Sequence, residues 1–137
     1  MSHQARTRVY SGGPWESIVG YSRATRVGDH IFVSGTTSIK DGHLVGQHDA
    51  ALQARQALAT IENALFKAGS SLQDTVRYRV YLTAVADWEA VAPVMAEAFG
   101  NVHPANTLVA VAALIDPDML VEIELDAIAG SGSDIER

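Results

Sequence analysis

The residues best suited to chemistry in this sequence are charged side chains that alternate with apolar ones near the C-terminus. In Val121–Leu125, Glu122 and Glu124 alternate with three apolar residues, which is the period of a β-strand with one buried face. Both carboxylates then leave the opposite face, where a carboxylate can accept a proton from water or pair with an arginine. What these two carboxylates meet is therefore the main question about function.

Arginine and tyrosine residues occur with the same two-residue spacing in two other β-prone segments. Arg79 shares its parity with Arg77 and Tyr81, and Arg23 follows Tyr21 by two residues. Because buried charges have to be paired, we expect these arginines to pair with carboxylates across the sheet or between subunits. The alternative is that Arg23 or Arg79 binds the carboxylate of a substrate.

Composition limits the classes of function. The chain has 137 residues, 47% of them hydrophobic and 19% charged, which is typical of one globular domain. A net charge of −6 argues against binding to nucleic-acid phosphates. The absence of cysteine from the sequence excludes disulfides, thiolate metal sites and cysteine nucleophiles.

Histidine spacing and hydropathy lead to further expectations. None of the five histidines has a partner four residues away or a paired zinc-ligand spacing, so we expect no metal and no other cofactor. No apolar run approaches the length of a membrane span, and Met1–Arg8 lacks the apolar segment of a secretory signal. We therefore expect a cytoplasmic protein that does not associate with membranes.

The elements that must position the charged residues follow the order β-β-α-β-α-β-β. Helical spacing of apolar residues predicts a helix over Ala51–Ala68, with Asp49 near its start and Gly69 beyond its end, and a second from Asp87 to Gly100. Strands are predicted at Ile18–Thr25, Ile31–Gly35, Thr75–Thr83, Thr107–Leu114 and Met119–Ala129. Two helices on one face of such a sheet form a two-layer α+β sandwich, whose other face meets water or another subunit.

The chain is expected to contain one domain over residues 14–129. Residues 1–13 are predicted to form a flexible N-terminal arm, residues 130–137 a flexible tail, and Gly35–Gly46 a loop. A monomer of this length buries only about two-thirds of its unfolded surface, so we expect it to oligomerise.

Several motifs between Trp15 and Ala129 cover nearly the whole chain. They are Gly28–Gly35, Gln53–Leu58, Leu65–Gly69, Val80–Leu82, Phe99, Pro104–Thr107 and Val121–Glu124. In this order and spacing they resemble the RidA family, also called YjgF or Rid. The resemblance implies a fold like that of the trimeric class of chorismate mutase. It also implies a homotrimer whose sheets surround a central β-barrel, with clefts between the subunits.

The resemblance also implies a site in each of these clefts. Family members that deaminate reactive enamines and imines use an arginine to bind the substrate carboxylate and a glutamate to position the attacking water. The family's glutamate matches Glu122 and its cleft tyrosine matches Tyr21. The serine at the end of the strand matches Ser34, with Gly35 beside it.

The position of the family's arginine holds Asn106, which cannot form a bidentate cationic clamp. An asparagine and a cysteine that are common in the family are replaced by Ala92 and Leu108. Asn106 suits a neutral or amide-like ligand, and by its position Thr107 offers a hydroxyl and a backbone amide to the same ligand. The alternative role of Asn106 is that of a strand-entry residue after Pro104.

We therefore expect a Rid-type hydrolase that deaminates a small imine or enamine, with Glu122 directing water and only weak activity on amino-acid-derived imines. The alternative is that Glu122 is merely a solvated or paired carboxylate in a regulatory trimer that binds a small metabolite without turnover. An endoribonuclease ranks third, because the acidic chain shows neither a basic stripe nor an interleaved aromatic platform.

Overall fold

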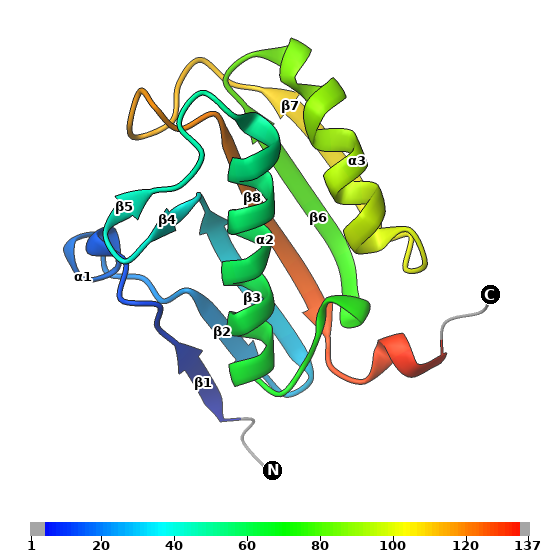
Figure 1. Cartoon of the computed structure of the whole chain (residues 1–137). Helices are drawn as coiled ribbons and strands as arrows, with labels where there is room; N and C mark the ends of the chain where they lie inside the picture. Colours follow the sequence, from blue (N-terminus) through cyan, green and yellow to red (C-terminus); the bar gives the residue numbers. More distant parts are fainter. Residues whose placement is uncertain (1–4, 135–137) are drawn as a thin grey trace.

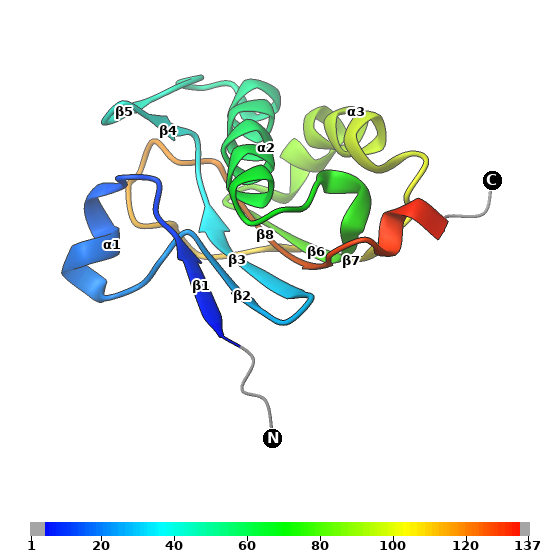
Figure 2. The same ribbon diagram turned by 90° about the horizontal axis from the view of Figure 1, so that it is seen from below.

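Two helices cover one face of a six-stranded sheet in the computed structural model, which describes residues 5–134 (Figure 1). The helices are α2 (Ala50–Lys67) and α3 (Trp88–Phe99). Seen from below, both helices lie on the same side of the strands, and within residues 5–134 no helix covers the opposite face of the sheet (Figure 2). The two-layer α+β architecture expected from the sequence is confirmed.

The six strands follow the order β1-β2-β3-β8-β6-β7 across the sheet. Every neighbouring pair is antiparallel except β6 and β7, which are parallel. The strands are β1 (Arg6–Val9), β2 (Ala24–Val27), β3 (His30–Thr36), β6 (Thr75–Leu82), β7 (Ala105–Ala110) and β8 (Val121–Ile128). The smaller elements are helix α1 (Pro14–Val19), the hairpin strands β4 (Ile39–Lys40) and β5 (His43–Leu44), and 3-10 turns at Leu72–Asp74, Val85–Asp87 and Ser131–Asp134.

The core lies between α2 and α3 and the sheet because the buried residues of each element fall on one face. Helix α2 begins after Asp49, whose side chain accepts a hydrogen bond of 3.0 Å from the backbone N–H of Leu52. Its apolar stripe is buried, with Ile61 and Leu65 completely inaccessible. The helix stops before Gly69, whose φ of +82° favours a residue without a side chain.

Strand β8 shows the predicted alternation, and it lies inside the sheet between β3 and β6. Its odd-numbered residues from Val121 to Ala127 are at most 1% exposed and face the helices. Its even-numbered residues, which include Glu122 and Glu124, therefore face the side that the helices leave open. We call this side the open face of the sheet.

The structure corrects two expectations about local structure near the N-terminal end of the chain. Part of the predicted arm is strand β1, whose Arg6 pairs with Val27 of β2. The strand predicted at Ile18–Thr25 is wrong in its first half, because that half contains the end of α1 and a left-handed turn at Gly20 (φ 89°). The short alternation in this segment did not distinguish a strand from a helix followed by a turn.

Two further differences concern segments that were expected to be irregular. Part of the predicted tail is a 3-10 turn at Ser131–Asp134, and the Asp74 carboxylate holds the start of this segment. It accepts hydrogen bonds from the backbone N–H groups of Gly130 (3.1 Å) and Gly132 (2.9 Å). The loop predicted from Gly35 to Gly46 contains the small hairpin of β4 and β5. The proposed domain limits of 14 and 129 stay a prediction.

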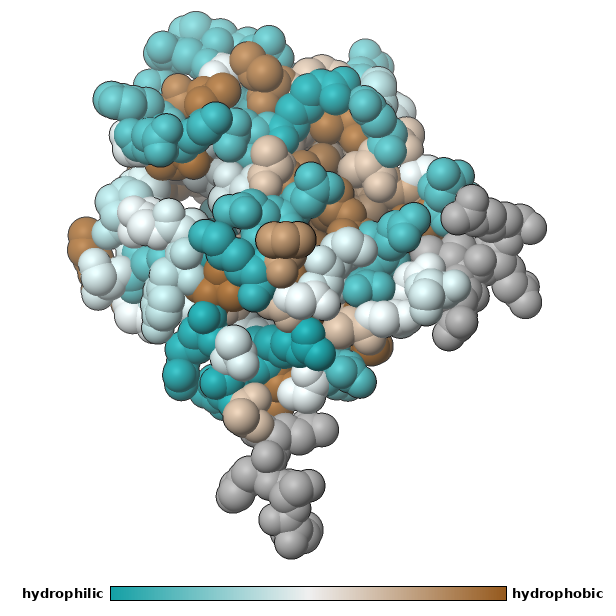
Figure 3. Space-filling view, turned by 60° about the horizontal axis from the view of Figure 1, so that its bottom comes forward, coloured by the Kyte–Doolittle hydropathy of each residue, from teal (hydrophilic) through white to brown (hydrophobic). Residues whose placement is uncertain are grey.

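The surface contains both hydrophobic and hydrophilic residues. Large apolar side chains such as Ile18 and Phe66 are each 76% exposed. On the side shown in Figure 3, hydrophobic residues (brown) are interspersed with hydrophilic ones (teal) rather than joined in one expanse. Among residues 5–134, no helix combines the length and hydropathy that crossing a membrane requires.

Candidate functional site

Glu122 lies against a glycine that leaves space for its carboxyl group. A Cβ atom added to Gly35 would stand 3.0 Å from the Glu122 Cδ and 3.1 Å from its Oε2. The register of β3 against β8 shifts between Val33 and Thr36, so a bulge forms at this point of the sheet. The bulge and the missing side chain of Gly35 together allow the Glu122 carboxyl group to sit close to the backbone of β3.

The environment of Glu122 favours its protonated form. Burial raises its pKa above the ordinary value of 4.5, and the neighbouring charge of Glu124 raises it further. The charge of Arg23 lowers the pKa of Glu122 but does not reverse the shift. Among residues 5–134, no hydrogen bond or ion pair engages the Glu122 carboxyl group. The group is therefore available to bind a proton, a water molecule or a ligand.

Glu122 opens into a cavity of about 790 Å³, a volume typical of small-molecule sites. We call it the Glu122 cavity. Tyr21, Arg23 and Thr36 line it together with Glu122. The rest of its wall comes mainly from residues 9–15, residues 39–42 and one side of α2. Of the residues expected at the site, the structure thus brings Tyr21 and Arg23 to the same cavity as Glu122, with Gly35 in contact with its carboxyl group.

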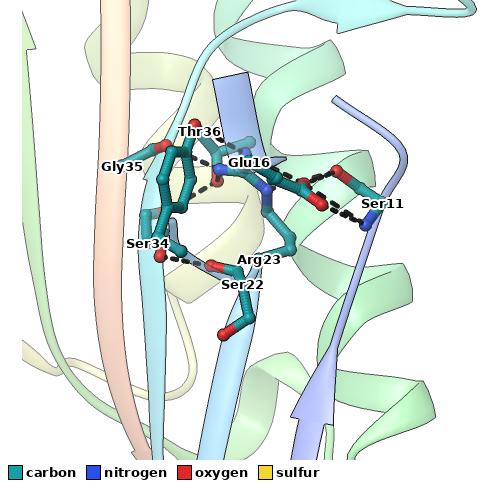
Figure 4. Close-up of polar contacts among 8 residues, drawn as sticks. Ser11, Glu16, Ser22, Arg23, Ser34, Gly35 and Thr36 are labelled. Carbon is teal, nitrogen blue, oxygen red and sulfur yellow. Dashed lines mark hydrogen bonds and ion pairs between the residues drawn. The ribbon is translucent and has the colours of Figure 1, made fainter. Parts of the chain in front are cut away.

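Arg23 is held by internal hydrogen bonds and is only 7% exposed (Figure 4). Its five N–H donors are directed to Ser11 Oγ (3.3 Å), the Gly35 carbonyl oxygen (2.6 Å), Thr36 Oγ1 (3.1 Å), Glu16 Oε2 (3.3 Å) and the Tyr21 hydroxyl (3.5 Å). An arginine has no more than five such donors. Arg23 therefore has none left for a substrate carboxylate unless it gives up a partner in this network.

Glu16 is the buried counter-charge of Arg23 and is 5% exposed. Burial raises the pKa of Glu16, but hydrogen bonds from the Ser11 hydroxyl and backbone N–H, with the charge of Arg23, outweigh burial and lower it. The carboxylate is consequently ionised at neutral pH. We call Ser11, Glu16 and Arg23 the ion-pair network. It fixes a positive charge beside the Glu122 cavity.

Arg79 and Ser34 are engaged in contacts within the sheet. Arg79 lies 3.9 Å from the carboxylates of both Glu124 and Asp126, and the Tyr81 hydroxyl donates a hydrogen bond to Glu124. This is the cross-strand pairing that the alternation of charges favours. The Ser34 hydroxyl donates to the carbonyl oxygen of residue 22 (2.7 Å), and Ser34 does not line the Glu122 cavity.

Asn106 lies at a second cavity, of about 560 Å³, between α3 and strands β6 and β7. We call it the Asn106 cavity. Most of its wall is apolar, and the rings of Tyr78 and Phe99 stack there with centroids 4.4 Å apart. The replacements noted at Ala92 and Leu108 both fall in this wall. The residues that differ from the family's pattern thus cluster in one place.

The side chain of Asn106 is oriented by two backbone carbonyl groups. Its Nδ2 atom donates to the Tyr78 oxygen at 3.2 Å and lies 3.4 Å from the Thr107 oxygen. Thr107 does not line the Asn106 cavity, because side chains alternate along β7 and its own points to the open face. Within one chain the side chains of Asn106 and Thr107 therefore point to opposite faces of the sheet, and their expected contact with one ligand stays a prediction.

One chain does not bring Asn106 and Glu122 together. Asn106 pairs with Tyr78, which pairs with Leu125, three residues along β8 from Glu122. This register separates the two Cα atoms by about 14 Å, and the side chains leave opposite faces of the sheet. The candidate site is therefore present as two separate halves on a single chain.

Several residues of these halves were not predicted as site residues. Glu16 and Ser11 are brought to Arg23 by the turn at Gly20, and no period in the sequence links them. Trp88 is 50% exposed and lines the Asn106 cavity. The signal available in the sequence was a large aromatic residue at the start of the predicted helix, four residues before the replaced position at Ala92. Within residues 5–134, no three His, Cys, Asp or Glu side chains are grouped as a metal site.

The fold and the two halves define a class of protein: an α+β sandwich that carries a carboxylate at a small-molecule cavity. The sequence model of the endoribonuclease L-PSP family, which includes the RidA and YjgF proteins, matches residues 14–129. The chain therefore belongs to the YjgF/RidA family.

Similar proteins agree with this assignment. Rv2704 of Mycobacterium tuberculosis, from the YjgF/YER057c/UK114 family, is 48% identical, with a TM-score of 0.83 over 91% of this chain and 100% of that one. A Rid-family protein from Yersinia pestis is 30% identical, with a TM-score of 0.82 over 91% of this chain and 100% of its own. The 3-aminoacrylate deaminase RutC of Acinetobacter baylyi is 38% identical over 77% of this chain and 84% of its own.

Proposed function

We propose that the protein is a Rid-type hydrolase that deaminates a small reactive imine, or an enamine through its imine tautomer. Water adds its oxygen to the imine carbon, and the C=N electron pair moves to the nitrogen. The C–N bond then breaks, so that one imine and one water give one carbonyl compound and one ammonia, without a change of oxidation state. The protein has to aim the water and to move protons from oxygen to nitrogen.

The observation that carries this proposal is the state of Glu122. Its carboxyl group faces a cavity, has a raised pKa and has no intrachain partner among the described residues. A carboxylate of this kind accepts a proton from water more readily than an ordinary one, and once protonated it can deliver that proton to a leaving nitrogen. A purely structural carboxylate is expected to have partners, as Glu16 and Glu124 do.

We further propose that the working site lies between copies of the chain in a homotrimer. The two halves face away from each other in one chain, and the open face of the sheet exposes Phe32 (49%) and Val109 (41%). A second copy that brings its Asn106 cavity to the Glu122 cavity of the first would complete the site and cover these residues. The related RutC of Acinetobacter baylyi is a 3-aminoacrylate deaminase, which supports the reaction class.

Within this proposal the chain represents a subgroup without the carboxylate-binding arginine. Asn106 occupies the arginine's position, and Arg23 is committed to its five internal contacts. We therefore assign Arg23 to fixing the site rather than to gripping the substrate, and Arg79 to pairing within the sheet. An endoribonuclease ranks last, because the open face carries arginines and carboxylates together and the chain has a net charge of −6.

The test is the release of ammonia from freshly generated imines by the wild type and by Glu122→Gln. We expect the variant to lose on the order of 10²- to 10⁴-fold in rate, because it lacks the proton acceptor. The activity of the wild type should fall as the pH drops through the pKa of Glu122, at a higher pH than for an ordinary glutamate. The imines should be made both with and without a carboxylate.

The matched control is Asp126→Asn, which removes a carboxylate from the same face of the same strand at a distance from the Glu122 cavity. It should keep most of the activity. Light scattering should report the same trimer for all three proteins. If the folded wild-type trimer accelerates the hydrolysis of no imine, the protein is a binding module and the hydrolase proposal is wrong.

A further inference from the structure

The Asn106 cavity has the walls of a selective ligand site. Its apolar lining includes Trp88, Phe99 and Leu108, and none of its lining residues is Lys, Arg, Asp or Glu. Besides the Tyr78 phenol, its one ionisable lining side chain is that of His103, so a carboxylate placed there would lose its hydration without a lysine or arginine to pair with, which is unfavourable. An uncharged apolar group, in contrast, would be stabilised by leaving water.

The polar end of the cavity presents a hydrogen-bond acceptor. The Asn106 Nδ2 group faces the carbonyl oxygen of Tyr78 at 3.2 Å and that of Thr107 at 3.4 Å, and only the amide nitrogen can donate to such oxygens. The amide orientation is therefore fixed by its partners. The Oδ1 atom takes part in no hydrogen bond among the described residues and is left for a ligand. It can accept an N–H but repels a carboxylate.

From these two observations we infer that the Asn106 cavity binds the apolar substituent of a ligand that lacks a carboxylate and donates an N–H to Asn106 Oδ1. Resting on the proposed function, this names the substrate class: an imine or iminium with an aliphatic or aromatic side chain and no acid group. The cavity of about 560 Å³ accommodates a substituent of that size.

The inference can be tested by binding, independently of turnover. The probes are 2-phenylacetamide and phenylacetate, which share the apolar ring and differ in whether they offer an N–H or a carboxylate. Calorimetric titration of the wild type and of Glu122→Gln should give tighter binding of the amide by about tenfold or more. The indole N–H signal of Trp88, which lines the cavity, should shift on titration and locate the ligand.

Asn106→Arg should reverse the preference, because a guanidinium binds a carboxylate and offers no acceptor. The matched control is Asn101→Arg, the same change of side chain at an exposed position that does not line the cavity. It should leave the preference for the amide unchanged. Reversal by both variants would show a general charge effect and would overturn the inference.

Equal or tighter binding of phenylacetate by the wild type would also overturn it, as would ligand shifts that spare Trp88. Failure of the inference and failure of the proposed function remain distinguishable. If the protein binds the amide selectively but releases no ammonia, the hydrolase proposal is refuted and the inferred class of ligand stands. Turnover confined to carboxylated imines would keep the hydrolase and refute the ligand class.

Discussion

The two cavities of this protein are built on opposite principles. Beside the Glu122 cavity, Glu16 and Arg23 are buried as an ion pair, and each is surrounded by hydrogen-bond partners. The Asn106 cavity is walled by stacked rings and aliphatic side chains, with Asn106 and His103 among its few polar side chains. The charge of Arg23 lowers the pKa of Glu122, whereas the second cavity offers a ligand mainly apolar contacts. In the functions proposed above, chemistry and selectivity are therefore assigned to different regions of one chain.

The largest effect is expected from breaking the ion-pair network. Glu16→Gln removes the counter-charge of Arg23 and leaves a buried guanidinium unpaired, which should lower the free energy of unfolding by about 3–5 kcal/mol. Because the pKa of Glu16 is lowered in the fold, its stabilising contribution is present above its ordinary value of 4.5. The contribution is lost as the pH falls through the lowered pKa. Urea unfolding at neutral and acid pH measures both effects.

The matched control for this prediction is Glu97→Gln. Glu97 forms an ion pair of 2.9 Å with Arg55, but its side chain is 69% exposed. Such surface pairs contribute less than about 1 kcal/mol. If Glu16→Gln were as mild as Glu97→Gln at neutral pH, the ion-pair network would not be what holds this region together.

The sequence predicted the parts of the fold that a local period determines. The stripe of α2 and the strict alternation of β8 each bury one face, so their residues identified both the element and the orientation of Glu122. Strand β1 escaped prediction because its stability comes from pairing with β2, which lies more than ten residues away along the chain. Pairing between distant segments leaves no local period.

The candidate site also contains a part that could be predicted from the sequence and a part that could not. The orientation of Glu122 followed from parity, and its expected role followed from the family resemblance. Parity applied to β7 would also have separated Thr107 from Asn106, because neighbouring side chains in a strand face opposite ways. The role of Glu16 could not be predicted, since only the fold brings it to Arg23. The engagement of all five donors of Arg23 was equally unpredictable. It depends on distances in the fold, which the spacing of residues in the sequence does not reveal.

A smaller effect is expected from the contact between Gly35 and Glu122. Gly35→Ala would place a Cβ atom 3.0 Å from the Glu122 Cδ, and the flexible carboxyl group has to move away. Stability should change by less than about 1 kcal/mol, because the end of a flexible side chain yields easily. The rate of ammonia release should fall by about tenfold, because the proton acceptor is displaced from its position.

A double-mutant cycle separates this displacement from general damage to the fold. In the Glu122→Gln background, Gly35→Ala should have almost no further effect on the rate, because the group that it displaces is already inactive. Equal losses in both backgrounds would mean that Gly35 acts through the backbone of β3 rather than through Glu122.

The smallest effect is expected on the stability of Glu122→Gln, which should not fall at neutral pH, in contrast to that of Glu16→Gln. It connects the raised pKa of Glu122 with the stability of the fold. Its pKa is raised in the fold by burial and by Glu124, so the folded protein binds a proton at Glu122 more tightly than the unfolded chain does. Stability is therefore lost as the pH rises from the ordinary value of 4.5 through the raised pKa. Glu122→Gln removes this penalty and should leave the protein at neutral pH at least as stable as the wild type, although the proposed function predicts that the variant is inactive. Thermal unfolding of both proteins across this pH range measures the difference in their stability. A variant that is less stable than the wild type at neutral pH would show that the ionised Glu122 carboxylate stabilises the fold, instead of being kept available for a substrate.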